Sequence, residues 1–168
     1  MSLELITGPM YSGKSTELIR RILHLKNIGM RCCVINHSND TRVQGNFIQT
    51  HDGKKLSAFK TDDILLVRVK DYDAIAIDEG QFFSNLKIAI RLMLEKKKHV
   101  IVAGLNGDYK QNAFGEIHEL ISMANDITFK KATCKCGVPA AFTKRLDQTT
   151  ELISVHSKYI AVCRKCYE

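Results

Sequence analysis

A glycine-rich segment near the N-terminus has the residue types and spacing that bind phosphate. Residues 8–15 read Gly-Pro-Met-Tyr-Ser-Gly-Lys-Ser, which is the pattern Gly, four residues, Gly, Lys, Ser. Glycine at both ends permits backbone torsions that turn successive amide N–H groups toward phosphate oxygens. An ordinary strand-to-helix turn has no need of Lys followed by Ser. The residues expected to hold phosphate are Gly8, Pro9, Met10, Tyr11, Ser12, Gly13, Lys14, Ser15 and Thr16.

Two carboxylates follow an apolar run and complement this loop. Ala74 to Ile77 reads as a buried strand, and Asp78 and Glu79 come directly after it. A phosphate loop needs a carboxylate on the metal side, so we expect Ser15 and Asp78 to serve Mg²⁺ while Lys14 reaches the β and γ phosphates. Glu79 could take a proton from a hydroxyl or from water. The alternative for Glu79 is a solvated loop carboxylate.

Aromatic residues follow the same strand and the next one. The segment Gly80-Gln81-Phe82-Phe83 comes after Glu79, and Tyr109 and Phe114 come after the apolar run Val100 to Gly104. In an open α/β sheet, ligands bind beyond the carboxyl ends of the strands, so these loops should face the phosphate loop. Aromatic rings there could enclose a planar base. Packing in the core is the alternative for any single Phe.

Four cysteines near the C-terminus have the character of metal ligands. Cys163 and Cys166 have the two-residue spacing that lets both sulfurs reach one tetrahedral Zn²⁺, and Cys134 and Cys136 are separated by one residue. A Cys₄ site leaves no position for water, so the zinc would be structural. Free buried thiols are the alternative, with His156 a candidate to replace one sulfur. Cys32 and Cys33 are adjacent in a strand, and we interpret both as core.

The elements that must position these residues alternate between strand and helix. Apolar runs at 3–7, 32–35, 74–77, 100–104 and 127–129 predict strands, and helical periodicity appears at 15–28, 86–94 and 117–124. Residues 36–60 are polar and predict a long loop or a hairpin. The pattern predicts an α/β fold with a parallel sheet covered on both faces. We expect a nucleotide-binding domain over residues 1–131 and a small cysteine-bearing domain over 132–168.

The net charge of the chain indicates the class of molecule that it binds. The chain has 168 residues and a formal charge of +7, from 25 Lys and Arg against 18 Asp and Glu. This favours a polyanionic partner, either a nucleotide or a nucleic acid. No apolar stretch approaches the length of a membrane span of about 18 residues, and Met1 to Thr7 is short and lacks a basic flank. We therefore expect a cytoplasmic protein with no membrane segment.

Several motifs together resemble the thymidine kinases of the cytosolic, bacterial and poxviral type. They are Gly-Pro-Met-Tyr-Ser-Gly-Lys-Ser-Thr at 8–16, Asp-Glu-Gly-Gln-Phe-Phe at 78–83, Gly-Leu-Asn-Gly at 104–107, Thr-Lys-Arg at 143–145 and Tyr-x-x-x-Cys-Arg-x-Cys-Tyr at 159–167. The resemblance spans nearly the whole chain. It implies a RecA-like phosphate-loop fold carrying a small zinc-stapled lasso.

The resemblance also implies an activity, which is transfer of the γ-phosphate of ATP to the 5′-hydroxyl of thymidine or deoxyuridine. Glu79 then becomes the general base, and Arg42 matches an arginine that helps to neutralise the transferring phosphoryl group. The positions matching those that bind the nucleoside are Met10, Gln81, Phe82, Leu105, Tyr109, Phe114, Thr143 and Tyr159. Family members are commonly homotetramers inhibited by thymidine triphosphate (dTTP).

The sequence departs from the family pattern at a few positions. The first cysteine pair is usually Cys-x-x-Cys, whereas Thr133 stands here where a ligand is expected. Ser154-Val155 replaces Gly-Gly, and Asn106 and Tyr109 replace the commoner Asp and Phe. Two other classes remain open: a zinc-containing ATPase that binds nucleic acid, and an inactive relative that only scaffolds partners. The intact set Lys14, Ser15, Asp78 and Glu79 argues against the second. We expect no nucleic-acid partner.

Overall fold

The central element of the fold is a parallel β-sheet. The computed structural model describes residues 1–40, 45–49, 53–147 and 158–168. Six strands lie in the order β5-β2-β6-β7-β1-β8, and every neighbouring pair is parallel. The strands are β1 (Ser2–Gly8), β2 (Cys32–His37), β5 (Phe59–Thr61), β6 (Ala74–Asp78), β7 (His99–Leu105) and β8 (Asp126–Phe129). The predicted α/β class is confirmed, and β7 lies between β1 and β6.

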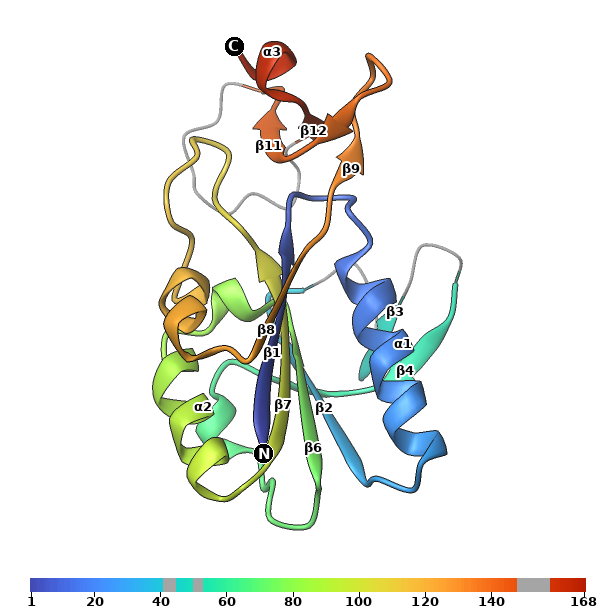
Figure 1. Cartoon of the computed structure of the whole chain (residues 1–168), viewed down its shortest axis with the longest axis vertical. Helices are drawn as coiled ribbons and strands as arrows, with labels where there is room; N and C mark the ends of the chain where they lie inside the picture. The colour runs from blue at the N-terminus through green and yellow to red at the C-terminus, as the bar shows by residue number, and fades with distance from the viewer. Residues whose placement is uncertain (41–44, 50–52, 148–157) are drawn as a thin grey trace.

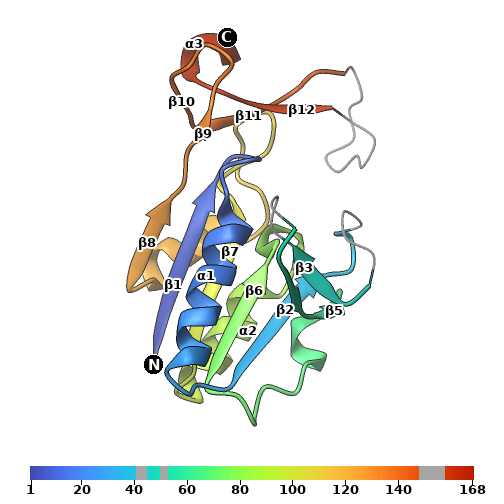
Figure 2. The ribbon, with the colours of Figure 1, turned by 90° about the vertical axis from the view of Figure 1, so that its right-hand side faces the viewer.

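Helices cover both faces of this sheet, as the sequence predicts. Figures 1 and 2 show α1 (Lys14–Asn27) on one face and α2 (Leu86–Glu95) on the other, together with the 3₁₀ helix η3 (Ile117–Met123). Alternate residues of one strand point to opposite faces. Val100 and Val102 therefore join the core beneath α2, whereas Ile101 and Ala103 join the core beneath α1. The sheet thus separates two apolar layers.

Three details differ from the sequence expectation or refine it. The helical period at 117–124 gives a 3₁₀ helix, not an α-helix, and its backbone bond from Glu119 N–H to the Glu116 carbonyl spans three residues. The polar stretch 36–60 contains the expected hairpin, β3 (Phe47–Gln49) with β4 (Lys55–Ser57). The end of this stretch leads into β5, which pairs with β2 at the edge of the sheet and which the sequence pattern did not predict.

The two adjacent cysteines in β2 belong to the core. Cys33 is buried in the layer beneath α2, and Cys32 packs against the layer beneath α1. Burial raises the pKa of the Cys33 thiol to about 11, so it stays protonated at neutral pH. The interpretation of both residues as core is confirmed.

Short elements make up the rest of the described chain. They are η1 (Ile64–Leu66), η2 (Gly80–Phe82), β9 (Ala132–Thr133), β10 (Pro139–Ala140), β11 (Phe142–Arg145), β12 (Tyr159–Val162) and α3 (Arg164–Tyr167). The last five gather beyond the end of the sheet that carries the tip of β1 (Figure 1). Of the helices in the described ranges, none combines the length and the apolar character that a membrane crossing needs.

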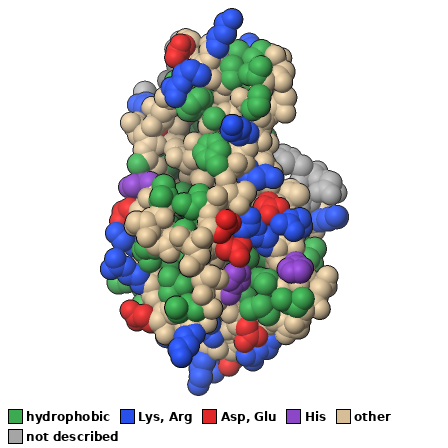
Figure 3. Space-filling model, in the orientation of Figure 1, with side chains coloured by type: hydrophobic (Ala, Val, Ile, Leu, Met, Phe, Trp, Pro, Cys, Tyr) green, Lys and Arg blue, Asp and Glu red, His purple; other side chains and the backbone are tan. Residues whose placement is uncertain are grey.

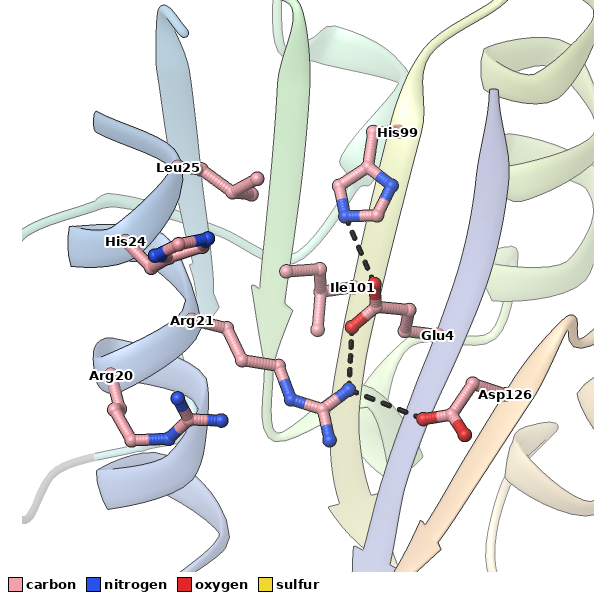
Figure 4. Close-up of a pocket in the computed structure, with 8 residues that line it drawn as sticks. All are labelled: Glu4, Arg20, Arg21, His24, Leu25, His99, Ile101 and Asp126. Carbon is pink, nitrogen blue, oxygen red and sulfur yellow. Dashed lines mark hydrogen bonds and ion pairs between the residues drawn. The ribbon is translucent and has the colours of Figure 1, made fainter. Parts of the chain in front are cut away.

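A network of charged side chains ties α1 to the sheet at the opposite end. Arg21 on α1 contacts Glu4 of β1 (Figure 4). It also donates to Thr128 Oγ1 of β8 at 2.7 Å. Within α1, Arg20 and Arg21 both donate to Glu17 at 2.7–2.8 Å. These bonds, those from Arg20 first, lower the pKa of Glu17 to about 2 although partial burial opposes the shift. The cavity beside this network, drawn in Figure 4, is lined by the first residues of β7 and β8, so it lies at the amino-terminal edge of the sheet.

We expect Glu17→Gln to lower the free energy of unfolding by about 1 kcal/mol at pH 7, after allowance for solvent screening. The folded-state pKa lies below the ordinary value, so this stabilisation is present above about pH 4.5 and disappears as the pH falls toward 2. Urea unfolding of the wild type and the variant across this range measures the difference. Glu95→Gln, at an exposed position, should change the free energy of unfolding by less than about 0.5 kcal/mol. A difference for Glu17→Gln that stays constant down to pH 2 contradicts the assignment.

Candidate active site

The phosphate loop connects the end of β1 to the start of α1 (Figure 2). Gly8 has φ 151°, and a Cβ there would lie 2.2 Å from the carbonyl oxygen of Lys130, so only glycine fits. Gly13, with φ 77°, is the N-cap of α1, and no described side chain caps the first turn. The N–H groups of that turn are therefore available to an anion, and the helix dipole favours one there.

Side chains within the loop fold onto its own backbone. The Lys14 ammonium donates to the carbonyl oxygen of Pro9 at 2.7 Å, and the Ser12 hydroxyl donates to the same oxygen at 2.8 Å. Lys14 is only 9% exposed. Ser15 is half-buried in the first turn of α1, whereas Tyr11 and Thr16 are exposed. A cation held inside the loop is placed to pair with a phosphate that enters it.

Two buried carboxylates stand at the tip of β6. Asp78 is the last residue of that strand and is 2% exposed, and Glu79 is 8% exposed. Asp78 Oδ1 accepts the backbone N–H of Glu79 at 3.0 Å. Glu79 has φ 54° and ψ 40°, a left-handed conformation that costs a non-glycine residue about 1 kcal/mol or more. Strained backbone and buried charge at one strand tip are typical of a catalytic position.

The tip of β2 adds polar residues that the sequence analysis did not select. Asn36 lies beside Asp78 in the parallel register, and its side-chain amide donates to Asp40 Oδ2 at 2.9 Å. Lys60 donates to the Asp40 backbone carbonyl at 2.9 Å. Asp40 is therefore a third buried carboxylate at this edge of the sheet. The available signal was its position just after an apolar strand, as with Asp78, but the polar composition of residues 36–60 masked it.

Aromatic rings form two groups beyond the strand ends. Phe82 meets Phe114 edge-on at 5.7 Å, and the ring of His37 lies 5.6 Å from that of Phe82. Burial lowers the pKa of His37, and its Nδ1 accepts the backbone N–H of Asn39 at 3.0 Å. Phe83 is fully buried in the core beneath α2. His37 is a second residue that the sequence analysis did not select.

The second aromatic group surrounds an arginine. Arg145 is buried, with its guanidinium 4.0 Å from the ring of Tyr109 and 5.0 Å from that of Tyr159. Its Nε also donates to the Tyr159 hydroxyl at 3.1 Å. Nearby, the backbone N–H of Met10 donates to Thr143 Oγ1 at 3.0 Å. The phosphate loop, the segment after β7 and the strands β11 and β12 are thus brought together, whereas Arg42 lies outside the described residues.

The four C-terminal cysteines converge on one point. The sulfur atoms of Cys134, Cys136, Cys163 and Cys166 all lie within 4.8 Å of one another. A tetrahedral zinc site with Zn–S bonds of about 2.3 Å separates its sulfurs by about 3.8 Å, and the Cys136 and Cys163 sulfurs are 3.6 Å apart. Gly137, with φ 87°, turns the chain after Cys136, and its N–H donates to the Cys134 carbonyl at 2.8 Å. The one-residue spacing therefore closes a four-sulfur cluster, and His156 lies outside the described residues.

Backbone donors favour the thiolate form of Cys134. N–H groups of Cys136 and Cys163 lower the pKa of Cys134 to about 6, and sharing protons with the other thiols raises the pKa of Cys166 to about 12. Thiolates are the form that binds zinc. The donor set thus fits a closed, structural Zn²⁺ site.

The cysteine-bearing region is joined to the rest of the protein by side chains. The Tyr167 hydroxyl donates to the Tyr109 carbonyl at 2.8 Å, and Asn106 Nδ2 donates to the Ala141 carbonyl at 3.3 Å. Lys144 donates to the carbonyls of Cys166 and Tyr167 at 3.1 and 2.7 Å. The sulfur cluster is therefore connected, through α3, to the segment that follows β7.

The fold and the site define a phosphate-loop nucleotide-binding protein. The thymidine kinase family model matches residues 1–167. The chain is 41% identical to the thymidine kinase of raccoon poxvirus, covering 98% of this chain and 96% of the relative. It is 39% identical to the thymidine kinase of vaccinia virus (strain Western Reserve), with the same coverage. Identity to the thymidine kinase of Choristoneura biennis entomopoxvirus is 41%, over 99% of this chain and 96% of the relative. The chain therefore belongs to the thymidine kinase family.

We expect the purified protein to contain about one zinc per chain and Cys163→Ser to lose most of it, because three thiolates do not complete the closed site. Elemental analysis measures the metal, and thermal unfolding measures the accompanying loss of stability. Lys135→Ser, an exposed substitution between two cluster cysteines, is the matched control and should keep the metal. A zinc-free preparation of the wild type that unfolds at the same temperature as the zinc-loaded protein contradicts the assignment.

Proposed function

We propose that the protein transfers the γ-phosphate of Mg·ATP to the 5′-hydroxyl of thymidine, and of deoxyuridine, to give the monophosphate. The observation that carries the proposal is the position of Glu79. This buried carboxylate lies at the same edge of one parallel sheet as the phosphate loop, in a chain of the thymidine kinase family. A donor phosphate and an acceptor hydroxyl could therefore meet there.

Charged side chains and backbone N–H groups at fixed positions would bind the phosphates of ATP. Lys14 and the N–H groups of the first turn of α1 hold the β and γ phosphates. Ser15 and Asp78 would hold Mg²⁺, which when bound neutralises charge on the phosphate oxygens. The buried position of Asp78, beside backbone donors at a strand tip, supports this role. Phosphoryl transfer leaves little covalent work for the protein, so these contacts supply most of the catalysis.

The acceptor side rests on Glu79. Its carboxylate takes the proton of the 5′-hydroxyl as the oxygen attacks the γ-phosphorus, and ADP leaves in line. Arg42, outside the described residues, would help to neutralise the transferring group. Asp40, held by the Asn36 amide at the neighbouring tip of β2, would bind a further hydroxyl of the acceptor. Carboxylate and amide groups are the usual partners of sugar hydroxyls.

The base would lie between the aromatic groups and the C-terminal strands. The Phe82–Phe114 pair offers an apolar wall, and the stack of Tyr109, Arg145 and Tyr159 orders the opposite side. The residues proposed to enclose the base are Met10, Phe82, Leu105, Tyr109, Phe114, Thr143 and Tyr159. Zinc, by ordering the cysteine-bearing region, would support the β11–β12 side of this pocket.

Other properties follow as proposals from family membership. We divide the chain into a kinase domain over residues 1–131 and a zinc-binding lasso domain over 132–168, a boundary that falls between β8 and β9. A homotetramer in the cytoplasm, inhibited by dTTP, is the form that the family suggests.

A nucleic-acid-dependent ATPase is the competing function. Figure 3 shows Lys and Arg side chains scattered among acidic and apolar ones on the face that it displays, without one continuous basic stripe. A small planar acceptor also suits an aromatic cluster beside a carboxylate better than a polymer backbone does.

An assay with labelled thymidine, deoxycytidine and deoxyguanosine tests the function directly. With Mg·ATP, we expect thymidine to yield its monophosphate with one ADP formed per product, and the other two nucleosides to react far more slowly. Adding DNA or RNA without nucleoside should not raise ATP consumption. The opposite pattern, ATP hydrolysis driven by nucleic acid with no monophosphate, overturns the proposal.

We expect Glu79→Gln to lower kcat by about 10²–10⁴-fold and to leave ATP affinity nearly unchanged, because it removes a proton acceptor and keeps the shape of the side chain. Steady-state kinetics and equilibrium nucleotide binding measure the two effects. The control Glu119→Gln removes a carboxylate that pairs with Lys87 at 2.6 Å on the α2 face, and it should keep kcat. Unchanged turnover in Glu79→Gln would remove this residue as the base.

A further inference from the structure

Gln81 bridges the carboxylate of Glu79 and the chain that leaves β7. Its side-chain Nε2 donates to Glu79 Oε2 at 2.6 Å, and its Oε1 accepts the backbone N–H of Leu105 at 3.0 Å. The sequence expectation placed Gln81 against the nucleoside. Both ends of its amide are instead engaged by the protein.

The orientation of this amide follows from its partners. A backbone N–H can only donate, so the amide oxygen must face Leu105, and the NH₂ group must then face Glu79. Exchanging the two ends would oppose two donors at Leu105 and two acceptors at Glu79. The donor to the carboxylate is therefore held in one direction by a strand of the central sheet.

Close packing restricts Gln81 further. The residue is 3% exposed. A Cβ at Gly104 would lie 3.1 Å from Gln81 Oε1, and a Cβ at Gly115 would lie 2.2 Å from the Gln81 carbonyl oxygen. Backbone thus approaches the residue on two sides where a larger side chain would not fit. Gln81 cannot change its position without moving β7 or the chain around Gly115.

We infer that Gln81 is a positioning residue for the general base. It holds the Glu79 carboxylate by a hydrogen bond anchored to β7, and so sets where that carboxylate meets the acceptor hydroxyl. The inference rests on the proposed function of Glu79 and adds the residue that orients it. A proton acceptor displaced by about 1 Å loses much of its effect, which gives Gln81 a measurable role without contact to the substrate.

The first test is Gln81→Met, which keeps the length of the side chain and removes the donor. We expect kcat to fall about 10–100-fold, as is typical when a group that orients a functional residue is lost. The KM for thymidine should change less than about threefold, and ATP affinity should be unchanged. A KM raised tenfold with normal kcat overturns the inference, because it assigns Gln81 to nucleoside binding.

A double-mutant cycle separates positioning from a general structural effect. If Gln81 acts through Glu79, then adding Gln81→Met to Glu79→Gln should lower kcat no further. If the two losses multiply, Gln81 acts elsewhere and the inference fails. The proposed function is judged separately, since it fails only if the wild type makes no monophosphate or if Glu79→Gln is fully active.

Two further variants keep the test decisive if Gln81→Met folds poorly. Gln81→Glu keeps an oxygen for the Leu105 N–H but places a carboxylate against Glu79, so we expect it to lose kcat, with thermal unfolding measured beside kcat to show that the protein is folded; full activity would overturn the inference. Asn125→Ala is the matched control, since Asn125 Oδ1 accepts the backbone N–H of Leu3 at 2.8 Å at the far end of β1. It should lower the unfolding midpoint while leaving kcat unchanged.

Discussion

The parallel register of β1, β6 and β7 is the constraint on which the site depends. Parallel strands end at one edge, so the phosphate loop after β1, the carboxylates after β6 and the turn after β7 are brought to the same place from distant parts of the sequence. The apolar residues that hold these strands together are buried on both faces. Packing in the two layers therefore determines where the chemically active groups lie.

That edge concentrates groups that are costly to bury. Asp78, Glu79 and Asp40 are all carboxylates with little exposure, and each accepts a hydrogen bond from a neighbouring residue. Burial of a charge is tolerated only where donors compensate for the lost water. The donors here come from backbone or from amides that are themselves anchored. The hydrogen bonds that stabilise these buried carboxylates also restrict the orientation of each carboxylate.

The sequence analysis identified the features that are encoded by a short run of neighbouring residues. The phosphate loop, the buried strands and the tip of β6 each follow from a short run of residue types, and the fold class follows from their order. The sequence analysis did not predict features that depend on contacts between residues far apart in the chain. The edge strand β5 is three residues long and pairs with β2. Lys60 of β5 donates to the Asp40 carbonyl, and the ring of His37 packs edge-on against that of Phe83. The cysteine spacing was ambiguous for the same reason, because the turn at Gly137 supplies geometry that spacing alone does not contain.

The close approach of Gly8 to the Lys130 carbonyl brings the phosphate loop against the chain that leads into the cysteine-bearing region. The backbone N–H of Lys130 also donates to the Thr7 carbonyl at 2.7 Å. Lys130 leads out of β8 toward β9, so the connection to the cysteine-bearing region lies directly against the first glycine of the phosphate loop. Any side chain at residue 8 would therefore collide with the chain that leads to the cysteine-bearing region, so the identity of one loop residue constrains both parts of the site.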